Sequence, residues 1–83
     1  MKYNGYTNYE TWSVLLWASN EEHLYRQTEK FVSWAADLAA FDFKCQTFFR
    51  DMFPDGTPDM DSADDMNLVD WKDIARNLTT WNH

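Results

Sequence analysis

Apolar residues recur every three or four positions along three stretches of the chain, which is the period of an α-helix. The stretch 20–39 has an apolar stripe of Leu24, Thr28, Phe31, Ala35 and Leu38, widened by Tyr25, Val32 and Trp34. The stretch 43–53 has an inner side of Cys45, Phe48, Phe49, Met52 and Phe53. The stretch 67–80 has an apolar face of Leu68, Trp71, Ile74, Ala75 and Leu78, which Trp81 closes. We predict a helix in each.

A fourth helix is predicted at 8–18, where apolar residues would cover more than half of the circumference. These residues are Trp12, Val14, Leu15, Leu16 and Trp17. Residues of this kind are more typical of a core than of a surface, so we expect Trp12, Trp17 and Trp71 to pack inside.

Helix starts are indicated by polar residues that can cap exposed N–H groups. Thr7 and Glu10 have the spacing of a capping box, and Ser19 with Glu22 repeats it before the second helix. Asn67 is the expected cap of the last helix.

Two further positions divide the chain between helices. Asp42 either caps a new helix or lies within a continuing one, and we favour a break there. Pro54 ends the third helix, because the residue before a proline is biased away from helical backbone.

The composition predicts an all-α fold. Only 2 Gly and 2 Pro are present among 83 residues, which disfavours a turn-rich β-sandwich. A chain this short is at most one domain, and its 15 aromatic residues supply the apolar area that a small core needs. We expect a single domain, 1–83, folded as a compact bundle of about four helices with an acidic loop before the last.

The acidic charge is concentrated in the last third of the chain. Residues 1–50 carry six acidic and five basic residues, a net charge of −1, whereas residues 51–83 carry eight and two, a net charge of −6. Direct binding to nucleic acid needs cationic groups, so a protein with a basic surface is the better partner. The candidate contacts are Asp51, Asp55, Asp59, Asp61, Asp64 and Asp65.

The loop 55–66 admits three interpretations. Asp59 and Asp61 have the spacing of the first two ligands of a calcium loop, but Ala63, Asp64 and Asp70 do not fit the positions that follow. Aspartates spaced two to four residues apart can instead imitate the phosphates of a nucleic acid. A solvated acidic surface is the third interpretation, and for a run of charges it is the common one.

Catalytic and metal chemistry find little support in the sequence. Cys45 is the single cysteine and lies on an apolar face, as a small core residue would, and the two histidines, His23 and His83, have no evident partner. We therefore expect no enzyme activity, no metal and no cofactor. Because no apolar run is long enough to cross a bilayer and no signal peptide is evident, we expect no membrane contact and a cytoplasmic location.

The N-terminal residues carry a resemblance. The run Asn4, Gly5, Tyr6, Thr7, Asn8, Tyr9, Glu10, Thr11 and Trp12, continued by Leu16, Trp17 and Asn20, resembles the opening motif of a family of small uncharacterised proteins encoded by bacteriophages and other mobile elements. Ser13 stands where members often have a second Asn. The resemblance implies a genomic setting and no known reaction.

Two functional hypotheses follow. The first is a small phage-encoded inhibitor that binds a basic surface of a host defence nuclease or complex, as anti-CRISPR and anti-restriction proteins do. The alternative is a phage adaptor or structural accessory protein, monomeric or homodimeric, that binds through Tyr3 and Tyr6. We expect the motif residues Asn4, Gly5, Thr7, Asn8, Glu10 and Trp12 to shape a turn at Asn4-Gly5 and the start of the first helix rather than contact a partner.

Overall fold

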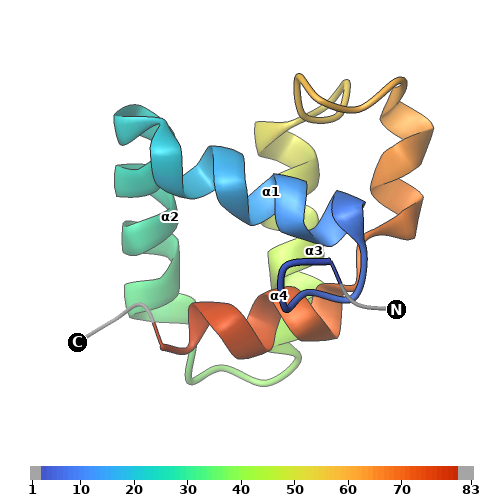
Figure 1. Cartoon of the computed structure of the whole chain (residues 1–83). Coiled ribbons are helices and arrows are strands. Elements are labelled where there is room, and N and C mark those ends of the chain that lie inside the picture. Colours follow the sequence, from blue (N-terminus) through green and yellow to red (C-terminus); the bar gives the residue numbers. More distant parts are fainter. Residues whose placement is uncertain (1–2, 81–83) are drawn as a thin grey trace.

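The computed structural model describes residues 3–80, and its regular elements are all helical (Figure 1). In chain order they are α1 (Tyr9–Asn20), α2 (Glu22–Ala35), α3 (Phe41–Met52), the 3-10 helix η1 (Ala63–Leu68) and α4 (Trp71–Leu78). The predicted all-α fold, with four principal helices, is confirmed for this part of the chain. Trp81 and His83 lie outside the described residues.

The helices run in two main directions. In Figure 1, α1 crosses the upper half, α2 descends from its end, α3 runs in a similar direction to α2, and α4 crosses the bottom. α1 packs against α2, η1 and α4, while α3 packs against α4 and α2. The radius of gyration is 11.7 Å, close to the roughly 11.8 Å expected for a compact chain of this length.

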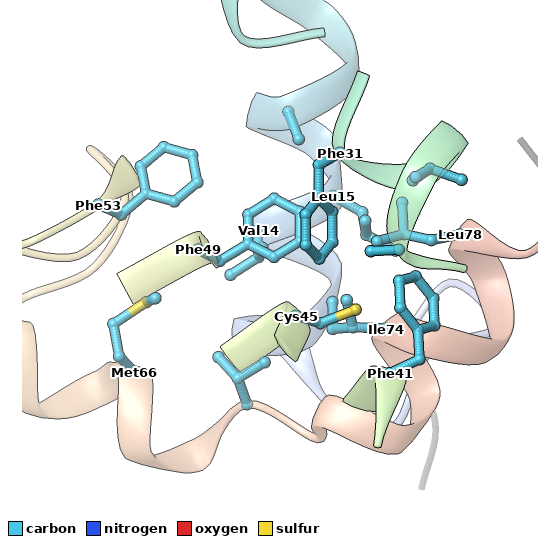
Figure 2. Close-up of a cluster of buried hydrophobic side chains, with 14 residues drawn as sticks. Val14, Leu15, Phe31, Phe41, Cys45, Phe49, Phe53, Met66, Ile74 and Leu78 are labelled. Atoms are coloured by element: carbon cyan, nitrogen blue, oxygen red, sulfur yellow. The ribbon is translucent and has the colours of Figure 1, made fainter. Parts of the chain in front are cut away.

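All five helices contribute side chains to one apolar cluster (Figure 2). Its fully enclosed members include Val14 of α1, Phe49 and Cys45 of α3, and Ile74 and Leu78 of α4. Trp17 and Trp71 pack against this cluster and are half-buried, whereas Trp12 is half-buried elsewhere. The predicted inner face of α3 is correct.

The two predicted N-terminal caps are wrong. Asn8, not Thr7, caps α1, and its side-chain oxygen accepts a hydrogen bond from the backbone N–H of Thr11. Glu10 makes no side-chain hydrogen bond to Thr7 among the described residues. Ser19 lies inside α1, which runs to Asn20, and its hydroxyl donates to the carbonyl of Leu15 one turn earlier instead of capping α2. α2 begins one residue after Glu21, without a side-chain cap.

The predicted second helix is too long. α2 ends at Ala35, and the chain turns through Ala40, whose φ of 56° is left-handed. Leu38 of the predicted stripe therefore lies beyond the helix and is 45% exposed, and Trp34, although within α2, is 61% exposed rather than buried. The apolar period continued in the sequence, but the helix did not.

The other boundaries shift by a few residues. α3 begins at Phe41, so Asp42 lies in its first turn and the expected break comes before it. Asn67 falls in η1, and the actual cap of α4 is Asp70, whose carboxylate accepts from the N–H groups of Lys72 and Asp73. Leu68 is therefore exposed rather than part of the α4 face. Within residues 3–80 no helix combines the length and apolar character needed to span a bilayer.

Candidate functional site

The chain opens with a tight turn, as Asn4-Gly5 predicted. Tyr3 and Tyr6 exchange two backbone hydrogen bonds, of 2.7 and 2.8 Å. Both central residues have positive φ, 49° at Asn4 and 88° at Gly5, the combination of a type I′ turn. This turn brings Tyr3 back over α1.

Asn8 ties the start of α1 to the segment before α4. Its side-chain oxygen accepts hydrogen bonds from the N–H and the hydroxyl of Thr11, at 2.9 and 2.6 Å. Its side-chain nitrogen donates to the carbonyl of Leu68 at 2.7 Å. The hydroxyl of the fully buried Thr11 then accepts from the N–H of Asp70 at 2.9 Å.

Thr7 makes the second connection. Its N–H and its hydroxyl both donate to the Asp73 carboxylate, at 2.8 and 3.0 Å, and the hydroxyl also lies 2.8 Å from the Asp70 carboxylate. We call Thr7, Asn8, Thr11, Asp70 and Asp73 the N-terminal clamp. It joins the helix starts of α1 and α4, which are about sixty residues apart in the sequence.

Asp73 is the buried charge of this clamp, with 2% of its surface exposed. Arg76 donates to it at 2.7 Å and Asn77 at 3.1 Å. Burial alone raises the pKa of a carboxyl, but the hydrogen bonds from the Thr7 N–H, Arg76 and the Thr7 hydroxyl outweigh it and hold the pKa of Asp73 below its ordinary 3.8. Asp73 is thus an ionised structural residue.

The N-terminal aromatics form a separate ring cluster. Tyr3 meets Tyr9 edge-on, with ring centroids 5.3 Å apart, and lies 5.0 Å from Trp12. Tyr3 remains 41% exposed, whereas Tyr6 is half-buried and packs against the core. Of the two tyrosines considered as partner contacts, Tyr3 is therefore the accessible one.

The acidic segment after α3 is anchored to α1. Ser13 and Thr57, both buried, share a hydrogen bond of 2.7 Å. The indole N–H of Trp17 donates to the carboxylate of Asp59 at 2.9 Å. Asp65 also has an internal role, because its carboxylate accepts from the N–H of Asp61.

Gly56 is required by the shape of this segment. Its φ is +86°, and a Cβ there would lie 3.2 Å from both the Met60 sulfur and the Ser62 carbonyl oxygen. The segment 55–62 is therefore a folded loop, continued by η1 (Figure 1).

Four of the six candidate aspartates remain available at the surface. Asp51, Asp55, Asp61 and Asp64 are exposed, and their carboxylates make no hydrogen bond or ion pair within residues 3–80. We call these four carboxylates the acidic corner. Asp51 lies in the last turn of α3, Asp55 and Asp61 in the loop that follows, and Asp64 in η1, which are the yellow and orange segments at the upper right of Figure 1.

A second surface feature, which the sequence did not indicate, lies between α2 and α3. It is a groove of about 300 Å³ lined by Phe31, Trp34, Phe43, Lys44, Thr47 and Phe48. The rings of Phe31 and Phe48 are stacked 4.2 Å apart, while Trp34 and Phe43 are 61% and 63% exposed. We call it the aromatic groove.

The residues considered for catalysis or metal binding do not gather. Cys45 is fully buried in the core, as expected, and burial, with the nearby Asp42 charge, raises the pKa of its thiol to about 12. His23 is exposed on α2 beside Gln27. No group of three or more potential metal ligands occurs in the described part of the chain.

Comparison with known proteins places residues 1–82 in one family model, described as a family of unknown function (DUF7249). No curated protein matched the chain. No solved structure matched it either.

Proposed function

The protein belongs to the DUF7249 family, whose function is unknown, and we propose that it is a small acidic inhibitor of a host defence nuclease or its nucleic-acid-binding complex. It would bind a basic surface of that partner through the acidic corner. The resemblance of the N-terminal motif to phage-encoded proteins supplies the setting, which is that of anti-CRISPR and anti-restriction proteins acting in the bacterial cytoplasm.

The observation that carries the proposal is the set of unpartnered carboxylates. Asp51, Asp55, Asp61 and Asp64 are exposed, and no cation or donor among residues 3–80 pairs with their carboxylates. By contrast, the chain uses Asp59, Asp70 and Asp73 in its own hydrogen bonds. Like charges without internal partners repel one another and slightly destabilise the fold. Their presence therefore favours a role in binding another molecule.

The acidic corner is also held in place before any partner arrives. The hydrogen bond between Ser13 and Thr57 and the one from Trp17 to Asp59 fix the loop on α1, and Met66 anchors η1 in the core. Fixing a binding loop in advance lowers the entropy lost on association. A fixed array of negative charge also accelerates encounter with a basic partner.

The test uses purified restriction nucleases and CRISPR effector complexes titrated with the protein in a DNA-cleavage assay. We expect inhibition to weaken as the salt concentration rises from about 0.1 to 1 M, because the Debye length, over which charges act, falls from about 10 to 3 Å. The variant Asp55→Asn/Asp61→Asn/Asp64→Asn should bind roughly 10–100-fold more weakly.

The matched control removes the same amount of charge elsewhere. Glu21→Gln/Glu29→Gln/Asp37→Asn changes three exposed acids on and beside α2 and should inhibit like the wild type. Absence of inhibition or binding across the panel would contradict the proposal. Equal binding by the two triple variants would also contradict it.

A second candidate function is that of an adaptor protein that binds through the N-terminal aromatics. The exposure of Tyr3 at the edge of the ring cluster favours it. Tyr3→Ala should then abolish partner capture while the aspartate variants retain it, and the opposite pattern would reject the adaptor.

A further inference from the structure

The aromatic groove exposes apolar side chains to water. Its walls are the exposed rings of Trp34 and Phe43, and its floor is the stacked pair Phe31 and Phe48. Monomeric proteins rarely leave large aromatic side chains clustered at the surface. Aromatic residues of this kind are enriched in protein interfaces.

The groove suits side chains better than a cofactor. Its volume of about 300 Å³ is at the lower limit of small-molecule sites. Lys44 is the single charged residue that lines it, and no carboxylate or histidine does so among the described residues. Such a surface offers little to orient a polar ligand, but it accepts an aromatic ring.

Charge distinguishes this face from the rest of the molecule. Residues 22–50, which include α2 and all but the end of α3, carry four acidic and four basic side chains. The remainder of the chain therefore carries the whole net charge of −7. Two copies of an acidic protein repel one another least where their surfaces are neutral, so two copies can approach through this face.

The face also presents both parts of a self-complementary contact. In an interface with two-fold symmetry, each copy contributes the same patch, so the patch must contain both the projecting group and the recess that receives it. Phe43 and Trp34 project beside the recess that they border. Lys30 and Lys44 lie on the same helices as Glu29 and Asp42, so charges of both signs are available for pairing.

We propose that the aromatic groove is the interface of a homodimer, in which an exposed ring of each copy enters the groove of the other. Asp51 of the acidic corner lies one turn after Thr47 on α3, next to this face, whereas Asp55, Asp61 and Asp64 lie beyond α3. A dimer would present two copies of these three. The apolar area is modest, since aromatic side chains bury about 150–250 Å² each. The interface is then at the small end of specific contacts, with a dissociation constant on the order of 10–100 µM.

Sedimentation velocity over a concentration series tests this. The wild type should change from monomer at low micromolar to dimer at high micromolar concentration, while Phe43→Asp stays monomeric throughout. Leu68→Asp is the matched control, because Leu68 is a similarly exposed apolar residue on η1 and its replacement should leave the dimer intact. Circular dichroism checks that each variant is folded.

A second measurement locates the interface directly. Ser33 is exposed on α2 and does not line the groove, whereas Cys45 is fully buried, so a spin label attaches selectively to Ser33→Cys and leaves the groove open. Pulsed electron resonance should show an intermolecular distance that Phe43→Asp removes. A wild type that stays monomeric at millimolar concentration, or a dimer unaffected by Phe43→Asp, would overturn the proposal.

Discussion

The N-terminal clamp and the acidic corner use the same kinds of polar residue in opposite ways. In the clamp, Thr7, Asn8 and Asp73 direct their side-chain polar groups to partners within the protein. In the acidic corner, the carboxylates of Asp55 and Asp64 have no partner within the part of the chain that the structure describes. The aspartates of α4 therefore hold the fold together, and those of the corner are free for another molecule.

The bonds of the N-terminal clamp also explain why the motif that precedes the apolar helix α1 is rich in polar residues. α4 has only eight residues, and a helix so short depends on tertiary contacts for its stability. Thr7 and Thr11 supply those contacts by bonding Asp73 and Asp70 at its first turn. We therefore interpret the motif as a structural device, and the predictions below measure how far it differs from the corner.

The largest effect is expected at Asp73. Asp73→Asn replaces a buried acceptor of four hydrogen bonds with a group that has one acceptor oxygen, leaving donors of Thr7 or Arg76 unpaired. Hydrogen bonds to charged groups contribute about 1.5–3 kcal/mol. We expect the free energy of unfolding in urea to fall by about 2–3 kcal/mol. Asp51→Asn, at an exposed position, is the control, and an equal loss there would contradict this prediction.

A smaller loss is expected at the backbone of the corner. Gly56→Ala places a Cβ against the Met60 sulfur and the Ser62 carbonyl oxygen in a left-handed conformation, at a cost of about 1–2 kcal/mol. Gly5→Ala is the matched control, because Gly5 has a similar φ of +88° but nothing within 4 Å of the added atom. Thermal unfolding should show a greater loss for Gly56→Ala than for Gly5→Ala.

Acid should lower the free energy of unfolding through the N-terminal clamp, because Asp73 stabilises the fold only while it is ionised. The pKa of Asp73 is lower in the folded protein than its ordinary 3.8, so its contribution to stability is complete above that pH and is lost as pH falls below it. The wild-type free energy of unfolding should fall in this range, and Asp73→Asn should fall less. Parallel curves for the two proteins, measured by urea unfolding between about pH 2 and 6, would show that Asp73 does not carry the effect.

The smallest effect on stability belongs to the acidic corner itself. Asp55→Asn/Asp61→Asn/Asp64→Asn should change the free energy of unfolding by less than about 0.5 kcal/mol, since exposed positions without partners contribute little. A slight gain is equally consistent, because removing like charges reduces repulsion. A large loss would show that these carboxylates belong to the fold.

Local pattern predicted the elements of this fold well where a helix buries a regular stripe. The inner face of α3 and the turn at Asn4-Gly5 follow directly from spacing and residue type. The end of α2 did not, because the apolar period of the sequence continues through Leu38 while the backbone turns at Ala40.

The caps failed for a different reason. The motif offers neighbouring cap residues in Thr7 and Asn8, and the choice between them depends on Asp73, which lies 66 positions away from Thr7. The buried pair Ser13 and Thr57 is equally invisible to local spacing. A signal was present in retrospect, since Asp70 and Asp73 have the positions of a helix cap and its first turn. The aromatic groove likewise depends on how α2 and α3 meet.

A double-mutant cycle between Thr7→Val and Asp73→Asn tests most directly whether the motif clamps α1 to α4. Thr7→Val removes the hydroxyl that donates to Asp73 and keeps the branched shape and the backbone N–H. If the two residues stabilise the fold through each other, urea unfolding of the four proteins should give a coupling free energy of about 1–2 kcal/mol. Losses that add to within about 0.3 kcal/mol would contradict the clamp.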